Sequence, residues 1–332
     1  MPAGDQRYLV TGALGCIGAW TVRALARRDV PVVAFDLATN TRRLELVASP
    51  DDLRRVTLAT GDITDLESIE RALDEHGITN VIHLAALQIP FCRADPPLGA
   101  RVNVVGTVNV FEAVRRRAER MGPVVYMGSI GMYAASDVDP SSGRLENDAV
   151  PHPTNLYGVY KLANEGTARV YWAEHGLSSI GLRPYTVYGP ARDQGLTSTP
   201  TKAIVAAILG RPYTVTFGGR TVFQYAEDVA ETLLVASRSK LAGAHAFHLG
   251  GSLAHVREFV AAIDAAVPGA AARIDVVEGG LPFPEDVAAE AIAVLGPVPV
   301  TALQDGVARS AALFRALHER GALVAEEQGL EA

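Results

Sequence analysis

The segment YGVYK at residues 157–161 brings two phenols and one amine close together in the chain. Residues four apart are neighbours on one face of a helix, so a helical segment places Tyr157 beside Lys161 and turns Tyr160 elsewhere. A free phenol has a pKa near about 10 and is a poor base at neutral pH, but a neighbouring ammonium favours the phenolate. The pair is therefore an acid–base centre or an ordinary exposed pair on a helix, whereas Tyr160 is expected to serve packing.

A glycine-rich turn lies near the start of the chain. The segment VTGALGCIG at residues 10–18 places Gly12, Gly15 and Gly18 where the first expected strand turns into the first helix. Glycine lets the backbone approach a pyrophosphate closely, and the helix N-terminus offers N–H groups and the positive end of its dipole. The turn predicts a dinucleotide site, with a tight turn that binds nothing as the alternative.

Two carboxylates follow the next two strands. Asp36 ends the second strand, about 20 residues past the glycines, where a carboxylate accepts hydrogen bonds from an adenosine ribose 2′-OH and repels a 2′-phosphate. Asp62, after the third strand, suits the adenine amino group. NAD is therefore favoured over NADP, although Arg42 and Arg43 lie close enough in the chain to pair with a 2′-phosphate.

The elements that must position these residues alternate along the chain. Short β-branched or apolar runs are followed by longer amphipathic stretches, which is typical of βαβ units and of a doubly wound parallel sheet in an α/β protein. We expect strands at 7–12, 31–36, 54–62, 80–86, 123–129, 178–184 and 245–251, and helices at 17–28, 66–76, 99–120 and 157–175.

The regularity drops after about residue 185, where Gly, Pro and Thr cluster in residues 188–200. We expect residues 1–184 to form a nucleotide-binding domain, with 236–251 returning to its sheet. Residues 185–235 and 252–332 would form a smaller, interleaved substrate-binding domain.

Composition excludes several classes of protein. The chain has 332 residues, 48% of them hydrophobic, and a net charge of −7 without a long basic block, so we expect no nucleic-acid partner. Its start shows neither a secretory signal nor a membrane segment, which predicts a cytoplasmic protein that binds no membrane. Two cysteines and eight scattered histidines predict neither a disulfide scaffold nor a metal site, and His83 and Cys92 are expected to be structural.

Taken together, these segments resemble the extended short-chain dehydrogenase/reductase superfamily and, within it, the NAD-dependent epimerase/dehydratase family. The matching segments are TGALGCIG (11–18), GDITD (61–65), HLAA (83–86), NVVGTVNVFEA (103–113), GSIGMYA (128–134), YGVYK (157–161), LRPYTVYGP (182–190) and YAEDVA (225–230). The resemblance implies a Rossmann-type sheet of about seven strands and NAD as the cofactor. It also makes Tyr157 and Lys161 the catalytic YxxxK pair, with Ser129 binding the reacting oxygen and Lys161 the nicotinamide ribose.

The resemblance further assigns binding roles and an assembly. The expected cofactor-binding residues are Gly12, Gly15, Cys16, Ile17, Gly18, Asp36, Asp62, Ile63, Leu84, Ala85, Ala86, Asn103, Tyr157, Lys161 and Pro184. The expected substrate-binding residues are Gln88, Ser129, Thr186, Arg192 and Arg220. The helices at 99–120 and 157–175 correspond to the pair that forms a four-helix bundle between two subunits in this superfamily, so a homodimer is expected.

Departures from the pattern separate the reactions of the superfamily. Ile130 and Gly131 stand where dehydratases carry an Asp–Glu acid pair, so a 4,6-dehydratase is disfavoured. Thr186 replaces an asparagine that contacts the phosphate side of nucleotide sugars, and Arg220 lies near the place of a diphosphate-binding arginine. We predict an epimerase that acts on a sugar nucleotide or related sugar through a keto intermediate. The alternative is a simple NAD-dependent dehydrogenase of a small polyol, sugar or sugar acid.

The segment at 189–203 is the expected substrate loop. Arg192 is its candidate anion-binding residue. Three neighbouring hydroxyl groups are its candidate donors: Thr197, Ser198 and Thr199.

Overall fold

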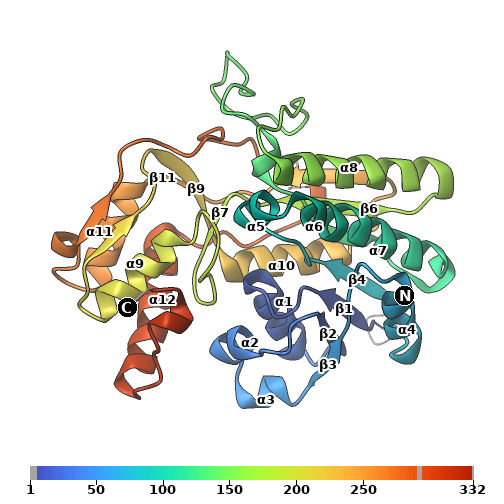
Figure 1. Cartoon of the computed structure of the whole chain (residues 1–332), viewed down its shortest axis with the longest axis horizontal. Coiled ribbons are helices and arrows are strands. Elements are labelled where there is room, and N and C mark those ends of the chain that lie inside the picture. Colours follow the sequence, from blue (N-terminus) through green and yellow to red (C-terminus); the bar gives the residue numbers. More distant parts are fainter. Residues whose placement is uncertain (1–5, 290–293, 331–332) are drawn as a thin grey trace.

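The computed structural model describes residues 6–289 and 294–330. Its main sheet has seven parallel strands in the order β10-β6-β5-β4-β1-β2-β3 (Figure 1). These strands are β1 (Tyr8–Thr11), β2 (Val32–Asp36), β3 (Val56–Thr60), β4 (Asn80–His83), β5 (Val124–Met127), β6 (Ser179–Arg183) and β10 (Ala244–His248). The predicted Rossmann-type α/β fold is confirmed. The strand order changes direction between β1 and β4, and in such sheets ligands bind at the carboxyl ends of the strands beside that point.

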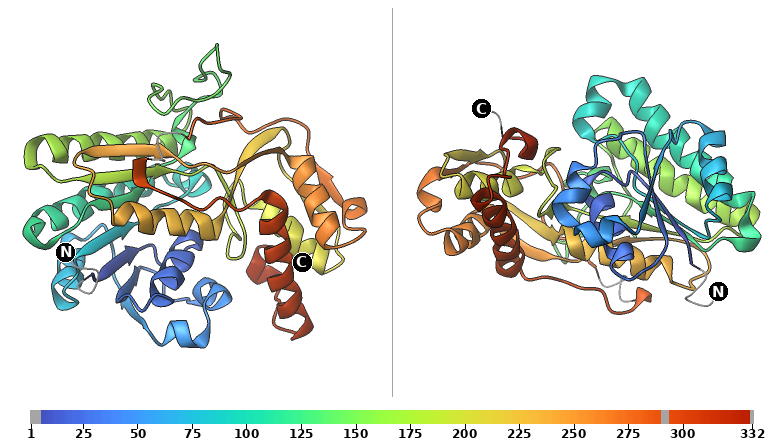
Figure 2. Two further views of the ribbon diagram at one scale, coloured as in Figure 1. Left: turned by 180° about the vertical axis from the view of Figure 1, so that it is seen from behind. Right: turned by 90° about the horizontal axis from the view of Figure 1, so that it is seen from below.

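Helices cover both faces of the sheet (Figure 2). One face packs against α1 (Cys16–Ala26), α2 (Arg42–Val47) and α10 (Ala226–Ser237), with α3 (Pro50–Leu53) beside α1. The other face packs against α4 (Leu66–Glu75), α7 (Gly106–Arg115) and α8 (Leu156–His175). Successive strand residues point to opposite faces, so Leu9 joins one core and Val10 the other.

The helix expected at 99–120 is interrupted, so its predicted bounds were wrong. The segment contains the end of α6 (Pro96–Ala100), a π-helical turn η2 (Arg101–Val105), α7 and a 3₁₀ turn η3 (Ala118–Arg120). A further short helix, α5 (Ile89–Ala94), precedes α6. Asp95 caps α6 by accepting a hydrogen bond from the Leu98 N–H at 3.0 Å, and proline suits the first turn that follows. The π-turn holds the buried Asn103, whose amide has polar partners in the preceding loop.

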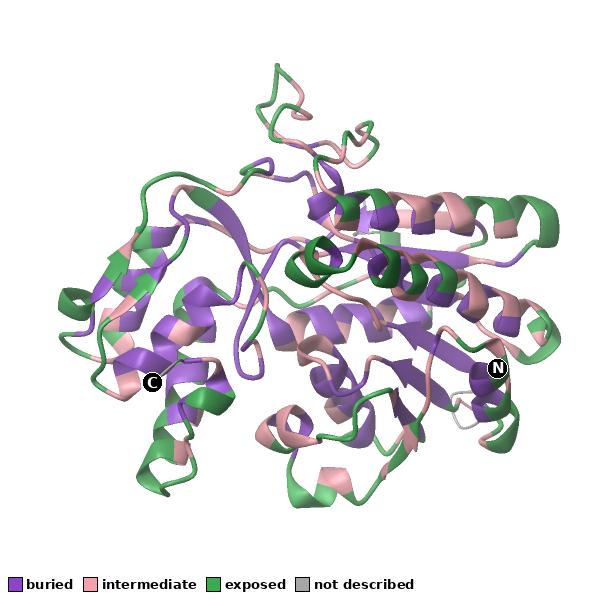
Figure 3. Ribbon diagram, viewed as in Figure 1, coloured by how far each residue is buried: buried purple, intermediate pink, exposed green. Residues whose placement is uncertain are grey.

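The second part of the molecule has its own core (Figure 3). A three-stranded sheet contains β11 (Ser252–His255), β9 (Arg220–Tyr225) and β7 (Thr186–Tyr188), and a separate pair contains β8 (Tyr213–Val215) and β12 (Ile274–Val276). Three helices, α9 (Thr199–Ile208), α11 (Val256–Ala266) and α12 (Leu303–Glu319), complete it with the 3₁₀ turns η5 (Ala271–Arg273) and η7 (Glu326–Gln328). Tyr188, Phe223 and Phe259 stack edge-on or tilted at its centre.

The boundary between the two proposed domains falls near α10. The buried residues Ala226, Val229 and Ala230 of this helix belong to the core of the main sheet. We therefore propose that all of α10 belongs with the nucleotide-binding part. The loop between η4 (Ile130–Met132) and α8 projects from the molecule (Figure 1), and its Leu145 forms a β-bridge with Val287.

Candidate active site

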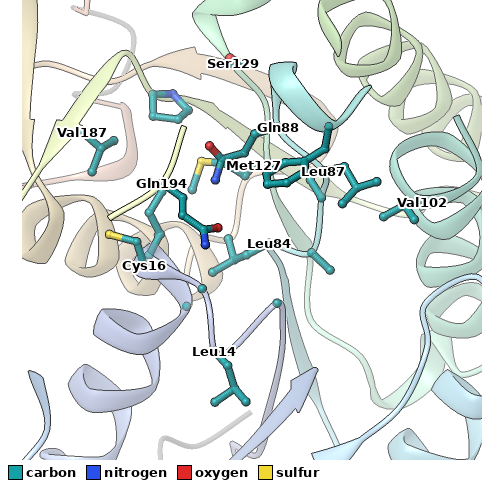
Figure 4. A pocket seen from close by; sticks show the side chains of 18 of the residues that line it. Leu14, Cys16, Leu84, Leu87, Gln88, Val102, Met127, Ser129, Val187 and Gln194 are labelled. Carbon is teal, nitrogen blue, oxygen red and sulfur yellow. The ribbon is translucent and has the colours of Figure 1, made fainter. Parts of the chain in front are cut away.

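A cavity of about 790 Å³ opens at the carboxyl ends of the central strands (Figure 4). Its walls come from the glycine turn after β1, the ends of β2 to β6, the start of α8 and the segment that follows β7. The side chains of Gln88 and Gln194 extend toward the same central space, while Ser129 lies farther along the wall. The cavity therefore lies where the strand order predicts a ligand.

The glycine turn is shaped by close backbone contacts. Gly12 has a φ of +66°, and a Cβ there would lie 2.6 Å from the backbone nitrogen of Ala85. A Cβ on Gly18 would lie 2.2 Å from the carbonyl oxygen of Gly12. Gly15 precedes α1 without a side-chain cap, so the first N–H groups of α1 are open to an anion beside the cavity. The turn fits a dinucleotide pyrophosphate.

Asp36 and Asp62 both line the cavity and are oriented by backbone N–H groups. Asp36 accepts hydrogen bonds from Leu14 at 2.9 Å and from Ala38 at 3.0 Å. Asp62 accepts one from Thr64 at 2.8 Å. A carboxylate has about four acceptor sites, so both retain capacity for ribose hydroxyls or an adenine amino group. These residues fit NAD.

Most of the other expected cofactor-binding residues also line the cavity. They are Cys16, Ile17, Ile63, Leu84, Ala85, Ala86 and Pro184. Asn103 is buried outside the cavity wall, where it exchanges hydrogen bonds with the backbone of Leu87 at 2.7 and 2.8 Å. Asn103 therefore positions the loop after β4.

The expected catalytic residues converge on this cavity. Asn155 caps α8 by accepting a hydrogen bond from the Gly158 N–H at 2.9 Å, which fixes the first turn that carries Tyr157. Lys161 donates to the Met127 carbonyl at 2.7 Å, and its Nζ lies 5.6 Å from the centroid of the Tyr157 ring. A Cβ on Gly131 would lie 3.2 Å from Ser129 Oγ and 3.4 Å from a Tyr157 ring carbon, so Gly131 lets the two approach each other.

Burial sets the electrostatics of these groups. Desolvation lowers the pKa of Lys161 to about 8. Desolvation also raises the pKa of Tyr157, and the neighbouring Ser129 hydroxyl and Arg192 guanidinium offset part of this shift. Burial is therefore the larger effect, and the pKa of Tyr157 is raised rather than lowered as expected from a neighbouring ammonium. Positive charge beside the phenol is what brings its pKa toward neutrality.

His83 and Cys92 have packing environments. The ring nitrogens of His83 lie 2.7 Å from Thr11 Oγ1 and 3.0 Å from Thr107 Oγ1, and burial lowers its pKa to about 3. Cys92 is buried and donates to the Leu87 carbonyl at 3.3 Å. Among the residues that the structure describes, no group of three or more His, Cys, Asp or Glu side chains is arranged to hold a metal ion.

The expected substrate residues divide into two groups. Gln88, Ser129 and Arg192 line the cavity, and so does Thr197, which accepts a hydrogen bond from Arg192 at 3.0 Å. The buried Nε of Arg192 has no hydrogen-bond partner among the described residues.

The remaining expected substrate residues lie outside the cavity. Thr186 is fully buried and bonds to Thr221 at 2.8 Å, while Arg220 is exposed at the start of β9. Ser198 donates to the Gly195 carbonyl at 2.8 Å, and Thr199 Oγ1 lies 3.4 Å from Thr216 Oγ1. The structure does not bring these side chains to the site.

Several cavity residues were not expected from the sequence, and three of them have polar or aromatic side chains on the substrate side: Tyr185, Gln194 and Phe283. Tyr185 lies in the family-like segment 182–190 and Gln194 in the Gly, Pro and Thr cluster at 188–200. Their place in these segments is the only feature of the sequence that could have indicated them. Phe283 comes from the distant segment after β12 and stacks edge-on with Tyr185 at 6.4 Å between ring centroids. No motif marks Phe283.

Together, the fold and this site define a dinucleotide-dependent enzyme of the short-chain dehydrogenase/reductase superfamily. The model of the "NAD dependent epimerase/dehydratase family" matches residues 8–250, and the chain belongs to this family. The family is NAD dependent, in agreement with the carboxylate of Asp36 at the end of β2.

Individual relatives extend this comparison. The chain is 29% identical over 242 residues to UDP-glucuronate 4-epimerase 1 of Arabidopsis thaliana, which covers 70% of this chain and 55% of the relative. The chain spans about half the length of the curated relatives it matches.

Two solved structures cover nearly the whole chain. The UDP-glucose 4-epimerase of Thermus thermophilus in complex with NAD is 27% identical, with a TM-score of 0.78, and covers 93% of this chain and 99% of that one. MoeE5 in complex with UDP-glucuronic acid and NAD is also 27% identical, with a TM-score of 0.76 and the same coverage.

Proposed function

We propose that the protein is an NAD-dependent epimerase that acts on a sugar nucleotide or related sugar through a transient keto intermediate. The observation that carries the proposal is a single cavity in which Tyr157 and Ser129 face a dinucleotide-binding turn, with Arg192 on the wall of the same cavity. The relatives that are named as 4-epimerases support it.

The residues that would hold NAD are those at the cavity. The glycine turn and the start of α1 would bind the pyrophosphate, Asp36 the adenosine ribose, Asp62 the adenine and Lys161 the nicotinamide ribose. When bound, NAD supplies a nicotinamide ring that takes up a hydride from a substrate carbon and can return it.

The side chains of the protein manage the proton and the position of the substrate. Tyr157 accepts the proton of the substrate hydroxyl as the carbonyl forms, and it returns that proton when the carbonyl is reduced. Ser129 hydrogen-bonds the reacting oxygen and fixes its distance from the phenol. Lys161, held by the Met127 carbonyl, keeps a positive charge near the phenol while its ammonium remains protonated. Epimerisation requires that the keto sugar rotates within the cavity before reduction.

Arg192 favours a substrate with an anionic group. Its guanidinium lines the cavity, donates to Thr197 and has a buried Nε that a carboxylate or phosphate oxygen could satisfy. A uronic acid attached to a nucleoside diphosphate carries both kinds of anion. UDP-glucuronic acid, which the structure of MoeE5 contains, is therefore the first compound to test.

A simple NAD-dependent dehydrogenase is the second candidate. Thr186 is buried and Arg220 lies outside the cavity, so neither provides a contact to a nucleotide diphosphate. A small sugar or sugar acid would not need these contacts. A dehydratase is not proposed, because Ile130 and Gly131 offer no carboxyl group after Ser129.

The experiment that tests the proposal combines two measurements. Denaturing the purified protein should release NAD, because an epimerase regenerates its cofactor in place. Incubation with UDP-glucuronic acid should give the 4-epimer by NMR without accumulation of NADH. Stoichiometric NADH from a free sugar acid, with no retained cofactor, would instead establish the dehydrogenase.

We also propose a cytoplasmic homodimer. The free thiols Cys16 and Cys92 suit a reducing compartment. Within the described part of the chain, no helix has the length and apolar character needed to cross a membrane. The exposed side chains of Val159 and Val170 on α8 support a subunit interface on this helix.

A further inference from the structure

We call residues 189–197 the strap. This segment connects the substrate side of the cavity with α1, the helix that follows the glycine turn on the cofactor side. Residue Ala191 has a φ of +73°, in the left-handed region, and Gly189 and Gly195 also have positive φ values. The carbonyl of Pro190 accepts a hydrogen bond from Trp20 Nε1 of α1 at 2.9 Å. The strap is thus fixed against the helix that follows the glycine turn.

Asp193 is the charged anchor of the strap on α2. It is 5% exposed and accepts hydrogen bonds from Arg42 at 2.6 Å and from Arg43 at 2.9 Å. Both arginines line the cavity. One buried carboxylate therefore binds both of the guanidinium groups that follow β2.

These arginines are linked to the residue that selects the ribose. Arg43 Nη1 lies 3.4 Å from the Leu14 carbonyl, and the Leu14 N–H donates to Asp36 at 2.9 Å. Asp36, the glycine turn, Arg43 and Asp193 thus form one connected set beside the adenosine end of the cavity. A phosphate on the ribose would have to compete with Asp193 for the guanidinium groups of Arg42 and Arg43.

We propose that Asp193 is a specificity-determining residue that makes the site select NAD over NADP; this rests on the proposed function, which places NAD in the cavity. Asp193 engages the N–H groups and charge of Arg42 and Arg43 that would otherwise bind a 2′-phosphate. Binding NADP would leave a buried carboxylate without its partners, which is unfavourable. Selectivity therefore comes from two carboxylates: Asp36 repels the phosphate, and Asp193 withholds the arginines.

The test measures binding without turnover. NADH and NADPH are titrated into the protein freed of cofactor, and the increase in nicotinamide fluorescence gives each dissociation constant. In Asp193→Asn the charge is lost at nearly constant volume, and the affinity for NADPH relative to NADH should rise about tenfold, as expected when a charge-assisted contact becomes available. The matched control is Glu45→Gln. Glu45 is exposed on α2, the helix that carries Arg42 and Arg43, and its replacement removes one negative charge without changing the partner of either arginine.

Two further variants locate the effect. Adding Arg42→Ala and Arg43→Ala to Asp193→Asn should abolish the gain in NADPH affinity. Arg42→Ala alone should weaken NADPH less than about threefold, since a guanidinium already paired with Asp193 contributes little to a phosphate. This variant retains Arg43 as the partner of Asp193, so it tests the proposal even if Asp193→Asn does not fold.

The outcomes separate this proposal from the proposed function. If NADH binds the unaltered protein but Asp193→Asn keeps the same NADPH-to-NADH ratio as Glu45→Gln, the role of Asp193 is wrong and the NAD site stands. A loss of NADPH affinity above about tenfold in Arg42→Ala would equally overturn it, by showing that Arg42 already binds the phosphate. If neither nucleotide binds the unaltered protein, the proposed function itself fails.

Discussion

Tyr157 and Tyr160 show how one turn of a helix separates a reacting group from a packing group. Tyr157 lines the cavity, whereas Tyr160 is buried and donates to the Pro96 carbonyl at 3.0 Å. Helical spacing predicts that Tyr157 and Lys161 share a face, and this depends only on local geometry. By contrast, the electrostatic surroundings of Tyr157 depend on Arg192, which is distant in the chain, and sequence spacing could not supply them.

The first residue-scale prediction concerns proton transfer. Tyr157→Phe should reduce turnover by roughly two to four orders of magnitude, the usual contribution of a positioned acid–base group, while NAD binding is kept. Tyr160→Phe loses a single hydrogen bond and should mainly reduce the free energy of unfolding, by about 1 kcal/mol. Steady-state kinetics and NAD titration of both variants check this. A larger loss of turnover in Tyr160→Phe would contradict the assignment.

The second residue-scale prediction concerns the buried amine. The pKa of Lys161 is about 8 in the folded protein and 10.5 as its ordinary value. Between these values the unfolded state binds more protons, so the free energy of unfolding should rise with pH. From about pH 8 to about pH 9.5 this contributes on the order of 2 kcal/mol, at about 1.4 kcal/mol for each pH unit.

Urea unfolding of the cofactor-free protein measures this contribution. Lys161→Met should lack it, so the unaltered protein should gain stability relative to the variant as the pH rises. Replacing the exposed Lys240 by Met is the control and should leave the pH profile parallel to that of the unaltered protein. A difference between Lys161→Met and the unaltered protein that stays constant over this pH range would be evidence against the desolvated amine.

At the scale of elements, strands of the main sheet were the predictable part. Each of the seven predicted segments overlaps a strand. The five inner strands β6, β5, β4, β1 and β2 are buried and almost continuously apolar, which makes them easy to predict, whereas the edge strands β10 and β3 are partly or mostly exposed. None of the strands of the second part was predicted: β7, β8 and β12 have three residues each, β11 has four and β9 has six. Such strands depend on their pairing partners more than on their own composition.

Arg220 was expected at the substrate site but lies outside the cavity, and strand pairing again explains the difference. The sequence places an arginine near the expected motif, but the register of β9 decides where it points. In that register Arg220 lies opposite His255 at the open end of the strand. Arg192 lies on the cavity wall because the strap passes along it. From the sequence, the Gly and Pro cluster indicated only a loop in this segment.

Arg192 carries the element-scale prediction, since the strap positions it. Arg192→Ala should raise the KM for UDP-glucuronic acid roughly 10- to 100-fold, the range for a lost charge-assisted contact, and leave kcat less affected if the contact is equal in ground and transition states. Arg192→Lys restores charge without the planar fork and should recover only part of this loss. Arg220→Ala is the matched control and should leave KM unchanged. Equal KM values for all three variants would remove Arg192 from substrate binding.

At the scale of the whole molecule, the two parts enclose the cavity and leave α8 at the outside (Figure 2). Residues Val159, Ala163, Gly166 and Val170 follow helical spacing along one side of α8. Val159 is 43% and Val170 51% exposed, and a Cβ on Gly166 would meet no described atom within 4 Å. This apolar, open stripe supports the proposed homodimer, because an exposed apolar row on a long helix is suited to packing against a second copy.

The last prediction tests this interface. Val170→Glu places a charge in the stripe, and burying it without a partner is costly, so the dimer should dissociate into monomers. Light scattering coupled to size-exclusion chromatography, at several protein concentrations, measures the mass. Val277→Glu is the control. Val277 is exposed to a similar extent, at 45%, but it lies after β12 in the second part of the molecule. The unaltered protein and the control should both elute as dimers, with circular dichroism spectra that match that of Val170→Glu. A monomeric unaltered protein, or a dimer that persists in Val170→Glu at low concentration, would show that α8 is not the interface.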